Sequence, residues 1–229
     1  MEPEAAYRYL EAKYEKGDYL SAVDGFDYYT LNYSGSSLVD SAQYLLAMSH
    51  FKLKEYLLSA DSFNELVRRF PRSSLVSEAM FQAGVAYWNL SPQYALDQEY
   101  TVKAVDALQG FIDYFPERSS RVREAQDLIE QCRDKLARKE FESGIIYIKM
   151  KDYPSAEIYL KSVMELYYDT PWAANAGYWV AFAQAGDDRP AEAITSLTEF
   201  LRKFPDHSLR PKAEEALERL KALPPSGDE

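Results

Sequence analysis

Apolar residues recur three and four positions apart along most of this chain, the spacing that places them on one face of an α-helix. The longest such stretch lies between Arg121 and Ser143, and neither Gly nor Pro interrupts it. Its apolar face consists of Val122, Ala125, Leu128, Ile129, Cys132, Leu136 and Phe141. We expect one long helix here, with Cys132 buried on its apolar side.

Segments that end one helix and start the next recur along the chain. Residues 70–74 read Phe-Pro-Arg-Ser-Ser, and the pattern returns at 115–119 and 204–208, with a degenerate copy at 168–171. Proline disfavours helix for the residue before it, and Ser or Thr can cap the helix that follows. These segments therefore predict helix boundaries at intervals along the chain.

A second pattern lies about half a repeat before these boundaries. It is a short turn that ends in Tyr, followed by a small residue and then, four positions later, a large one. The copies are Lys16–Tyr19 with Ala22 and Phe26, Lys54–Tyr56 with Ser59 and Phe63, and Lys151–Tyr153 with Ala156 and Leu160. Small residues let two helices cross closely, and large ones fill the space beside the crossing. The pattern therefore predicts helix pairs.

These positions resemble the tetratricopeptide repeat, which has a small residue at its position 8, an aromatic residue at 11, Ala at 20 and Pro at 32. Gly84 with Tyr87, and Gly144 with Tyr147, fit positions 8 and 11. Aligning position 20 yields five repeats, centred on Ala22, Ser59, Ala104, Ala156 and Ala193. Their spacings are 37, 45, 52 and 37 residues, against a family period of about 34.

Two extra segments account for the longer spacings. A loop at 91–100, which opens with Ser-Pro, is expected inside the third repeat, and the long helix is expected before the fourth. We therefore predict an all-α fold, an α-α superhelix (solenoid) of five tetratricopeptide-type helix pairs with a C-terminal capping helix. Residues 1–118 would hold repeats one to three, and 119–221 the long helix, repeats four and five and the capping helix. Residues 222–229 are expected to form a disordered tail.

Charge and hydropathy reduce the number of partner classes that the sequence allows. The net charge of −11 disfavours nucleic acid and anionic lipid, because both are bound by basic surfaces. No run of ~18 apolar residues that could span a membrane occurs. The first residues lack the apolar segment of a secretory signal, which leaves two readings open: a cytosolic protein, or a sequence that begins after a removed segment.

Motifs for catalysis are missing from the sequence. It has no Gly-rich phosphate loop, no paired His with metal-ligand spacing and no Ser nucleophile elbow. The Asp and Glu residues are scattered at the spacing of solvent-exposed helix faces. We therefore predict a non-enzymatic protein with no cofactor, no metal site and no catalytic residues.

The groove of such a solenoid is lined by positions 5, 9 and 12 of each first helix. In the first three repeats, six of these nine positions are aromatic: Tyr7, Tyr14, Tyr44, Phe51, Phe81 and Trp88. One reading is that these rings pack on one another in a tight superhelix. The other is an aromatic pocket for an extended or C-terminal peptide, because rings bury large areas at low entropic cost.

Two longer strings carry a more specific resemblance. Residues 90–101, followed by Ala104 and Phe111-Ile112, and residues 132–141, which lead to Gly144 and Tyr147, resemble the BamD family. These are lipoproteins of the bacterial outer-membrane β-barrel assembly machinery. The resemblance covers nearly the whole chain: five repeats, an insertion in the third and a long helix before the fourth.

The resemblance implies a periplasmic protein, held at the outer membrane by a lipidated N-terminal cysteine. No cysteine lies near Met1, so that anchor would lie outside this sequence. It also implies that the C-terminal repeats hold the periplasmic domains of BamA, alongside other lipoproteins of the machinery. The N-terminal repeats would receive the aromatic C-terminal peptides of unfolded outer-membrane proteins, and we expect the six aromatic residues above to do so.

Polar residues of the last repeats are candidates for the second partner. Asp187 and Arg189 lie in a predicted turn, and Arg210 and Lys212 on the capping helix. They could equally serve only to solubilise the end of the array. As a whole, the chain could instead be a repeat adaptor of another periplasmic or cytosolic pathway, or self-associate through exposed aromatic residues.

Overall fold

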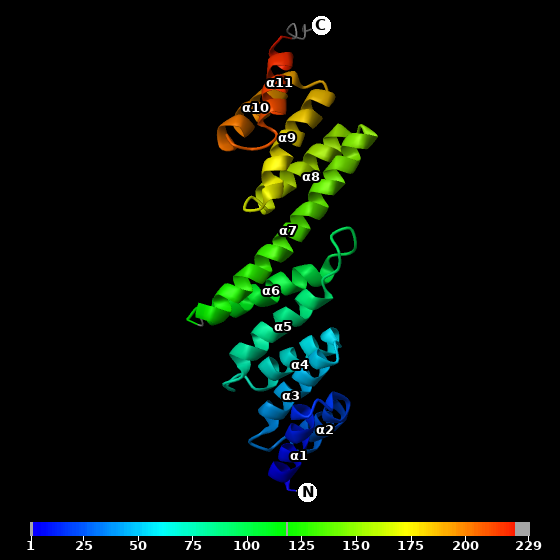
Figure 1. The fold of residues 1–229 in the computed structure, drawn as a ribbon, viewed down its shortest axis with the longest axis vertical. Helices are drawn as coiled ribbons and strands as arrows, with labels where there is room; N and C mark the ends of the chain where they lie inside the picture. The colour runs from blue at the N-terminus through cyan, green and yellow to red at the C-terminus, as the bar shows by residue number, and fades with distance from the viewer. Residues whose placement is uncertain (1, 118, 223–229) are drawn as a thin grey trace. The chain divides into compact units, whose positions relative to one another are not determined.

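The structure, a computed structural model, describes residues 2–117 and 119–222. All regular secondary structure in these residues is α-helical, which confirms the predicted fold class (Figure 1). The helices are α1 (Pro3–Glu15), α2 (Tyr19–Asn32), α3 (Val39–Lys52), α4 (Tyr56–Arg69), α5 (Val76–Leu90), α6 (Glu99–Tyr114), α7 (Ser119–Met150), α8 (Tyr153–Leu166), α9 (Pro171–Gly186), α10 (Pro190–Lys203) and α11 (Arg210–Lys221).

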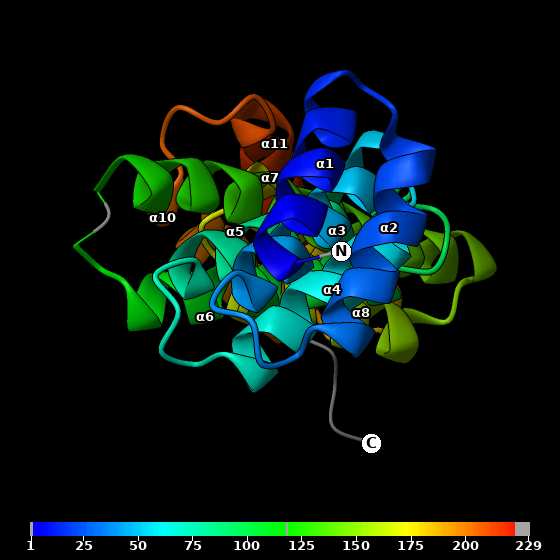
Figure 2. The ribbon, with the colours of Figure 1, turned by 90° about the horizontal axis from the view of Figure 1, so that it is seen from below.

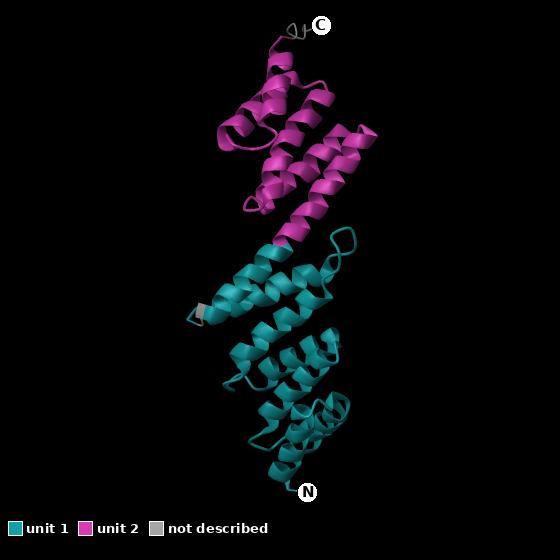
Figure 3. Cartoon of the chain, in the orientation of Figure 1, with its two compact units in different colours: residues 1–132 teal, residues 133–229 magenta. Residues whose placement is uncertain are grey.

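The helices form two compact units, unit 1 (Met1–Cys132) and unit 2 (Arg133–Glu229) (Figure 3). Successive helices pack on one another within each unit, and at the N-terminal end α1 and α2 lie side by side, both against α3 (Figure 2). The five pairs are α1/α2, α3/α4, α5/α6, α7/α8 and α9/α10, and α11 follows as the capping helix. Helix pairing thus follows the order that the repeats predict.

Helix ends form where the recurring segments predict them. The Asp18 and Asp152 side chains accept the backbone N–H groups of Ser21 and Ser155, at 3.4 and 3.2 Å, and so cap α2 and α8. In the Phe-Pro-Arg-Ser-Ser segment, the Ser73 hydroxyl accepts the N–H of Leu75 at 3.2 Å, just before α5. Polar side chains thus satisfy backbone groups that the helix itself leaves unpaired.

Small residues allow the two helices of a pair to approach closely. A Cβ atom on Gly84 would lie 2.6 Å from Leu108 of the partner helix, and one on Gly144 would lie 2.7 Å from Leu160. Ser59 is fully buried, and its hydroxyl donates to the carbonyl of Ala47 at 2.9 Å. These contacts explain why the repeat requires small side chains at these positions.

Helix α7 is longer than the sequence suggested. It does not end near Ser143 but continues through Gly144 to Met150, so its last part is the first helix of the fourth pair. Glycine inside a helix costs only about 1 kcal/mol relative to Ala, and this glycine is packed against α8. The boundary between the two compact units falls inside α7, between Cys132 and Arg133. The division at 118/119, drawn between repeats, stays a prediction. Cys132 is buried, as predicted.

The insertion of the third repeat is a loop at 91–98, since Glu99 and Tyr100 already belong to α6. Gln98 is buried and holds the loop together. Its amide group donates to the carbonyls of Gln93 and Leu96 at 2.8 and 3.0 Å and accepts from Thr101 at 2.6 Å. Of the tail predicted at 222–229, residues 223–229 lie outside the described residues.

Candidate partner-binding surfaces

The six aromatic residues of the predicted groove form two rows, each with a spacing of 37 residues. The inner row consists of Tyr7, Tyr44 and Phe81, and the rim row of Tyr14, Phe51 and Trp88. Both rows lie on the first helices of the three pairs in unit 1, α1, α3 and α5. The two rows differ in burial, and therefore in whether a ligand can reach their rings.

The inner row packs towards the second helices. The Tyr7 ring lies 6.0 Å from that of Tyr29, and the Tyr44 ring lies 5.6 Å from that of Phe63. Phe81 is only 1% exposed, with its ring 5.5 Å from that of Phe111. Tyr7 is also buried, whereas Tyr44 is half-buried. Within this row, a ligand could therefore reach Tyr44 but not Phe81.

Two phenol groups of the inner row stay protonated over a wide pH range. Burial, reinforced by nearby Glu11, raises the pKa of Tyr7 to about 12. Burial, with a smaller contribution from Glu78, raises the pKa of Tyr44 to about 12 as well. Both hydroxyls therefore remain neutral hydrogen-bond donors at physiological pH.

The rim row is half-buried and lies near the ends of the first helices. The Tyr14 ring makes an edge contact with Tyr19 at 5.5 Å, and the Phe51 ring makes the equivalent contact with Tyr56 at 5.3 Å. Trp88 lies at the same position of α5 and is also half-buried. Self-packing thus accounts for Tyr7 and Phe81, while Tyr44 and the rim row retain accessible ring surface. That these rings receive a peptide stays a prediction.

One cation of this region was missed in the sequence reasoning. Arg121, from the start of α7, lies over the Phe81 ring, with its guanidinium carbon 4.8 Å from the ring centroid. It also pairs with Glu78 of α5 at 2.9 Å and with Glu124 at 2.8 Å. The Arg121 side chain remains 40% exposed. It brings a guanidinium, a group suited to carboxylates, next to the aromatic rows.

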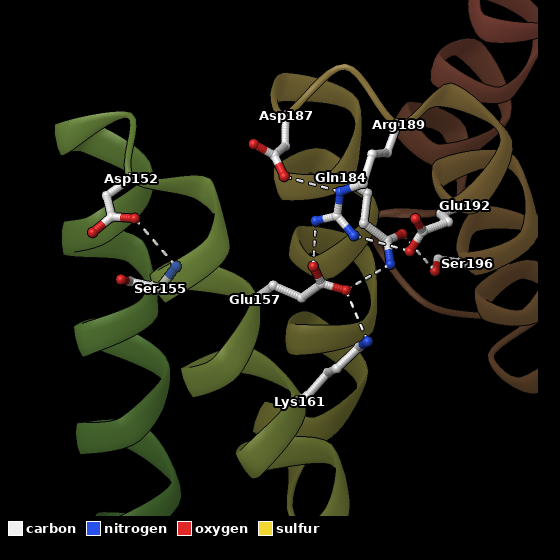
Figure 4. Close-up of polar contacts among 9 residues, drawn as sticks. All are labelled: Asp152, Ser155, Glu157, Lys161, Gln184, Asp187, Arg189, Glu192 and Ser196. Atoms are coloured by element: carbon white, nitrogen blue, oxygen red, sulfur yellow. Dashed lines mark hydrogen bonds and ion pairs between the residues drawn. The ribbon is translucent and has the colours of Figure 1, made fainter.

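In unit 2, a buried carboxylate organises the contacts between α8, α9 and α10 (Figure 4). Glu157 is 8% exposed and accepts hydrogen bonds from Arg189, from Lys161 at 2.8 Å and from Gln184 at 2.9 Å. The other side of Gln184 accepts from the Ser196 hydroxyl at 2.8 Å. Every polar atom of this cluster thus faces a partner within unit 2.

Electrostatics hold Glu157 in its charged form. Burial alone would raise its pKa, but the hydrogen bonds from Lys161, Arg189 and Gln184 outweigh burial and lower the pKa to about 2. Arg189 also pairs with Asp187 and Glu192, each at 2.9 Å. Asp187 and Arg189, two of the residues expected to contact a partner, therefore contribute to the structure of the turn itself.

The other two candidate residues lie on α11. Arg210 donates to the carbonyl of Pro205 at 3.0 Å and pairs with Glu214 at 2.8 Å. Lys212 is exposed. Neither is brought near Asp187 or Arg189 by any contact in the described part of the chain. These four residues are therefore not a single cluster, and a partner role for any of them stays a prediction.

Unit 2 instead has an apolar hollow of about 200 Å³ between α9 and α11. Tyr178, Phe182 and Ala185 line it from α9, and Ala216 and Leu220 from α11. Phe182 is 46% exposed. The three α9 residues occupy positions 5, 9 and 12 of the fifth repeat, so the rule used for repeats one to three would have found them.

Helix pairs with small-residue crossings, in this order, define a tetratricopeptide-repeat protein, and residues 175–207 match that repeat family. The chain belongs to the YfiO family, described as outer membrane lipoprotein, which it matches over residues 1–184. The resemblance to BamD, read from the two longer strings, is thereby confirmed. Among the described residues, no helix has the length and hydropathy of a membrane-spanning segment.

Two solved structures with similar folds are distant from this chain in sequence. The TPR2AB domain of yeast Sti1, in its pHSP90 complex, is 14% identical over 96% of this chain and 83% of its own, with a TM-score of 0.46. A repeat protein from Bacteroides fragilis is 14% identical over 96% of this chain and 98% of its own, with a TM-score of 0.48. No curated protein sequence matches the chain.

Proposed function

We propose that this chain is a non-enzymatic component of the outer-membrane β-barrel assembly machinery at the periplasmic face of the outer membrane. Unit 1 receives the C-terminal targeting signals of unfolded outer-membrane proteins, and unit 2 holds the periplasmic domains of BamA. Membership of a family of outer membrane lipoproteins supports this proposal. A repeat array built for binding other proteins supports it as well.

The observation that carries the receptor role is the combination of aromatic rings with Arg121 in unit 1. Tyr44 and the rim row offer half-buried ring surface, which suits the aromatic side chains of a targeting signal. Arg121 is bound to two carboxylates already and is 40% exposed, so a peptide carboxylate can replace one of them. A C-terminal aromatic residue presents both groups together.

The receptor role is tested with a fluorescent peptide that ends in Phe, and with the same peptide as its C-terminal amide. We expect the amide to bind more weakly to the native chain, and Arg121→Gln to abolish the difference between the two peptides. Replacing Tyr44 and Trp88 by Ala should weaken both peptides about tenfold or more, equivalent to ~1.4 kcal/mol. Tyr114→Ala, at an exposed ring of the same unit, is the matched control. Unchanged affinity in the Tyr44/Trp88 variant would disprove the groove assignment.

The scaffolding role is carried by the apolar hollow between α9 and α11. Phe182 exposes almost half of its surface at the edge of a hollow lined mainly by apolar side chains, as an anchor residue at an interface does. The Trp179 ring lies 5.1 Å from the Phe182 ring and restricts its position, and Tyr178 lines the same hollow. A side chain from a partner domain can fill the hollow beside it.

The scaffolding role is tested by calorimetry with the purified periplasmic domains of BamA from the same organism. We expect saturable one-to-one binding that Phe182→Ser weakens strongly and Leu166→Ser, an exposed residue elsewhere in unit 2, leaves unchanged. No heat up to ~100 μM, equivalent to binding weaker than about −5.5 kcal/mol, would favour a repeat adaptor of another pathway.

A further inference from the structure

The second helix of the first pair, α2, exposes a stripe of large apolar side chains. Leu20, Tyr28 and Leu31 are 68%, 60% and 68% exposed. At 100° per residue, Leu20 and Leu31 lie within about 20° of each other around the helix axis, and Tyr28 borders them. The opposite face of α2 is buried in the core of unit 1. The stripe is therefore an outer surface of a firmly packed helix, not a frayed end.

The stripe is acidic as well as apolar. Asp24 and Asp27 are the only charged side chains of α2, both are exposed, and both lie within about 40° of Leu20 around the axis. Neither forms an ion pair with another described residue. Lys16, the nearest cation before the helix, forms no ion pair with either aspartate in the described part of the chain, and Lys13 pairs with Asp18 at 2.8 Å. The two carboxylates thus stay available to a partner.

The equivalent helices of other pairs do not combine these properties. In α4 the exposed residues Leu57 and Leu58 share the helix with the cations Arg68 and Arg69. In α8 the exposed Ile158 lies three residues before Lys161, which pairs with Glu157. An apolar surface rimmed by carboxylates alone favours a ligand that carries both apolar and cationic side chains.

We propose that the stripe on α2, formed by Leu20, Asp24, Asp27, Tyr28 and Leu31, docks an amphipathic helix of a partner protein whose apolar side chains are flanked by Lys or Arg. Apolar residues of the partner cover the two leucines and the tyrosine, and its cations meet the two carboxylates. This is a helix-on-helix contact, in which anchors three and four positions apart match the stripe.

The two carboxylates disfavour the other possible occupants of the stripe, a second copy of this chain and an anionic membrane. A second copy docked through the same stripe would bring four carboxylates together, because a two-fold contact places each residue near its own counterpart. An anionic membrane surface is repelled by the same groups. The proposal is independent of the proposed function, because the stripe lies on a second helix, whereas the groove residues lie on first helices of unit 1 and the hollow lies in unit 2.

The experiment titrates the full chain with a labelled ~18-residue helical peptide of Leu and Lys in amphipathic order, and with the same peptide carrying Glu for Lys. We expect saturable binding of the Lys peptide alone, with amide shifts centred on α2 in NMR spectra. Leu20→Ser with Leu31→Ser should weaken it at least tenfold. Asp24→Asn with Asp27→Asn should weaken it several-fold and remove most of its dependence on salt. Ile158→Ser, equally exposed in α8, is the matched control and should leave binding unchanged.

Four outcomes would overturn the proposal. These are no binding of the Lys peptide at ~200 μM, equal binding of the Glu peptide, equal loss in the Ile158→Ser control, or shifts centred away from α2. Sedimentation and flotation with phosphatidylcholine vesicles test the remaining occupants. Self-association or vesicle binding that the Leu20/Leu31 variant abolishes would assign the stripe to a second copy or to lipid. All substituted side chains are exposed, so the variants are expected to fold, and thermal unfolding verifies this.

Discussion

Replacing Glu157 by Gln removes the charge at the centre of the unit 2 cluster and keeps the shape of the side chain. The pKa of Glu157 is lowered from 4.5 to about 2, and a shift of that size corresponds to about 3 kcal/mol of stability at neutral pH. The Gln amide oxygen can still accept a weaker hydrogen bond. We therefore expect Glu157→Gln to lower the free energy of unfolding of unit 2 by roughly 2 kcal/mol at pH 7.

The direction of the pKa shift of Glu157 determines how the stabilisation depends on pH. Because the pKa in the folded state is the lower one, the stabilisation is fully present above the pKa of the unfolded chain, 4.5. It is lost progressively as the pH falls towards 2, where the carboxylate of the native protein also becomes protonated. The difference between the native chain and Glu157→Gln should therefore be constant from pH 7 to about 5 and shrink below that.

Urea unfolding followed by tryptophan fluorescence can report on the unfolding of unit 2 alone. In a Trp88→Phe background the remaining tryptophans, Trp172 and Trp179, both lie in α9 and pack against the core of unit 2. Glu192→Gln is the matched control, because Glu192 is an exposed partner of the same arginine and its loss should change the stability by less than about 0.5 kcal/mol. A Glu157→Gln effect below about 1 kcal/mol, or one that does not change between pH 7 and pH 3, would refute the reasoning.

Three further predictions concern unit 1. Gly84→Ala should destabilise it by about 1–2 kcal/mol, because the added Cβ would lie 2.6 Å from Leu108. In Gly110→Ala the added Cβ would make only an ordinary contact with the Met80 methyl group at 3.9 Å, so this variant should be neutral or stabilising by up to about 1 kcal/mol, and denaturant unfolding compares the two. Ser59→Ala should cost about 1 kcal/mol in the same assay, since it removes a fully buried hydrogen bond. Gln98→Ala removes the side chain that holds the inserted loop, and should speed amide exchange and proteolysis at 91–98 with little change at other sites. Equal stability of the two glycine variants, an unchanged Ser59→Ala, or an unchanged loop would contradict these arguments.

The helix pairs could be predicted from sequence because their signals are local. Phe-Pro segments end α4, α6 and α10, and Asp18 and Asp152, in the turns between the two helices of a pair, cap α2 and α8. Small residues such as Gly84 mark the crossings. The end of the long helix was not predicted, although Gly144 at position 8 of the fourth repeat already required helix on both sides of it; in the structure Gly144 packs against α8 inside one continuous helix.

The surfaces were harder to predict because they depend on helices distant in sequence. The groove positions were assigned from the repeat alone, but the burial of Phe81 is set by Phe111, thirty residues later. Arg121 reaches Glu78 across 43 residues, which no local pattern reveals. Glu157 carried a usable signal: a charged residue between Ala156 and Leu160, on the apolar face of its helix, requires a buried partner.

Helix α7 has a consequence for how the chain folds. In repeat arrays each pair interacts mainly with its neighbours, so two halves can unfold separately at the weakest junction. Here the junction between Cys132 and Arg133 lies within one continuous helix, and extending an existing helix is far easier than nucleating a new one. Folding of either unit therefore provides the other with a preformed helical turn to grow from. We therefore expect the continuous backbone of α7 to couple the folding of the two units.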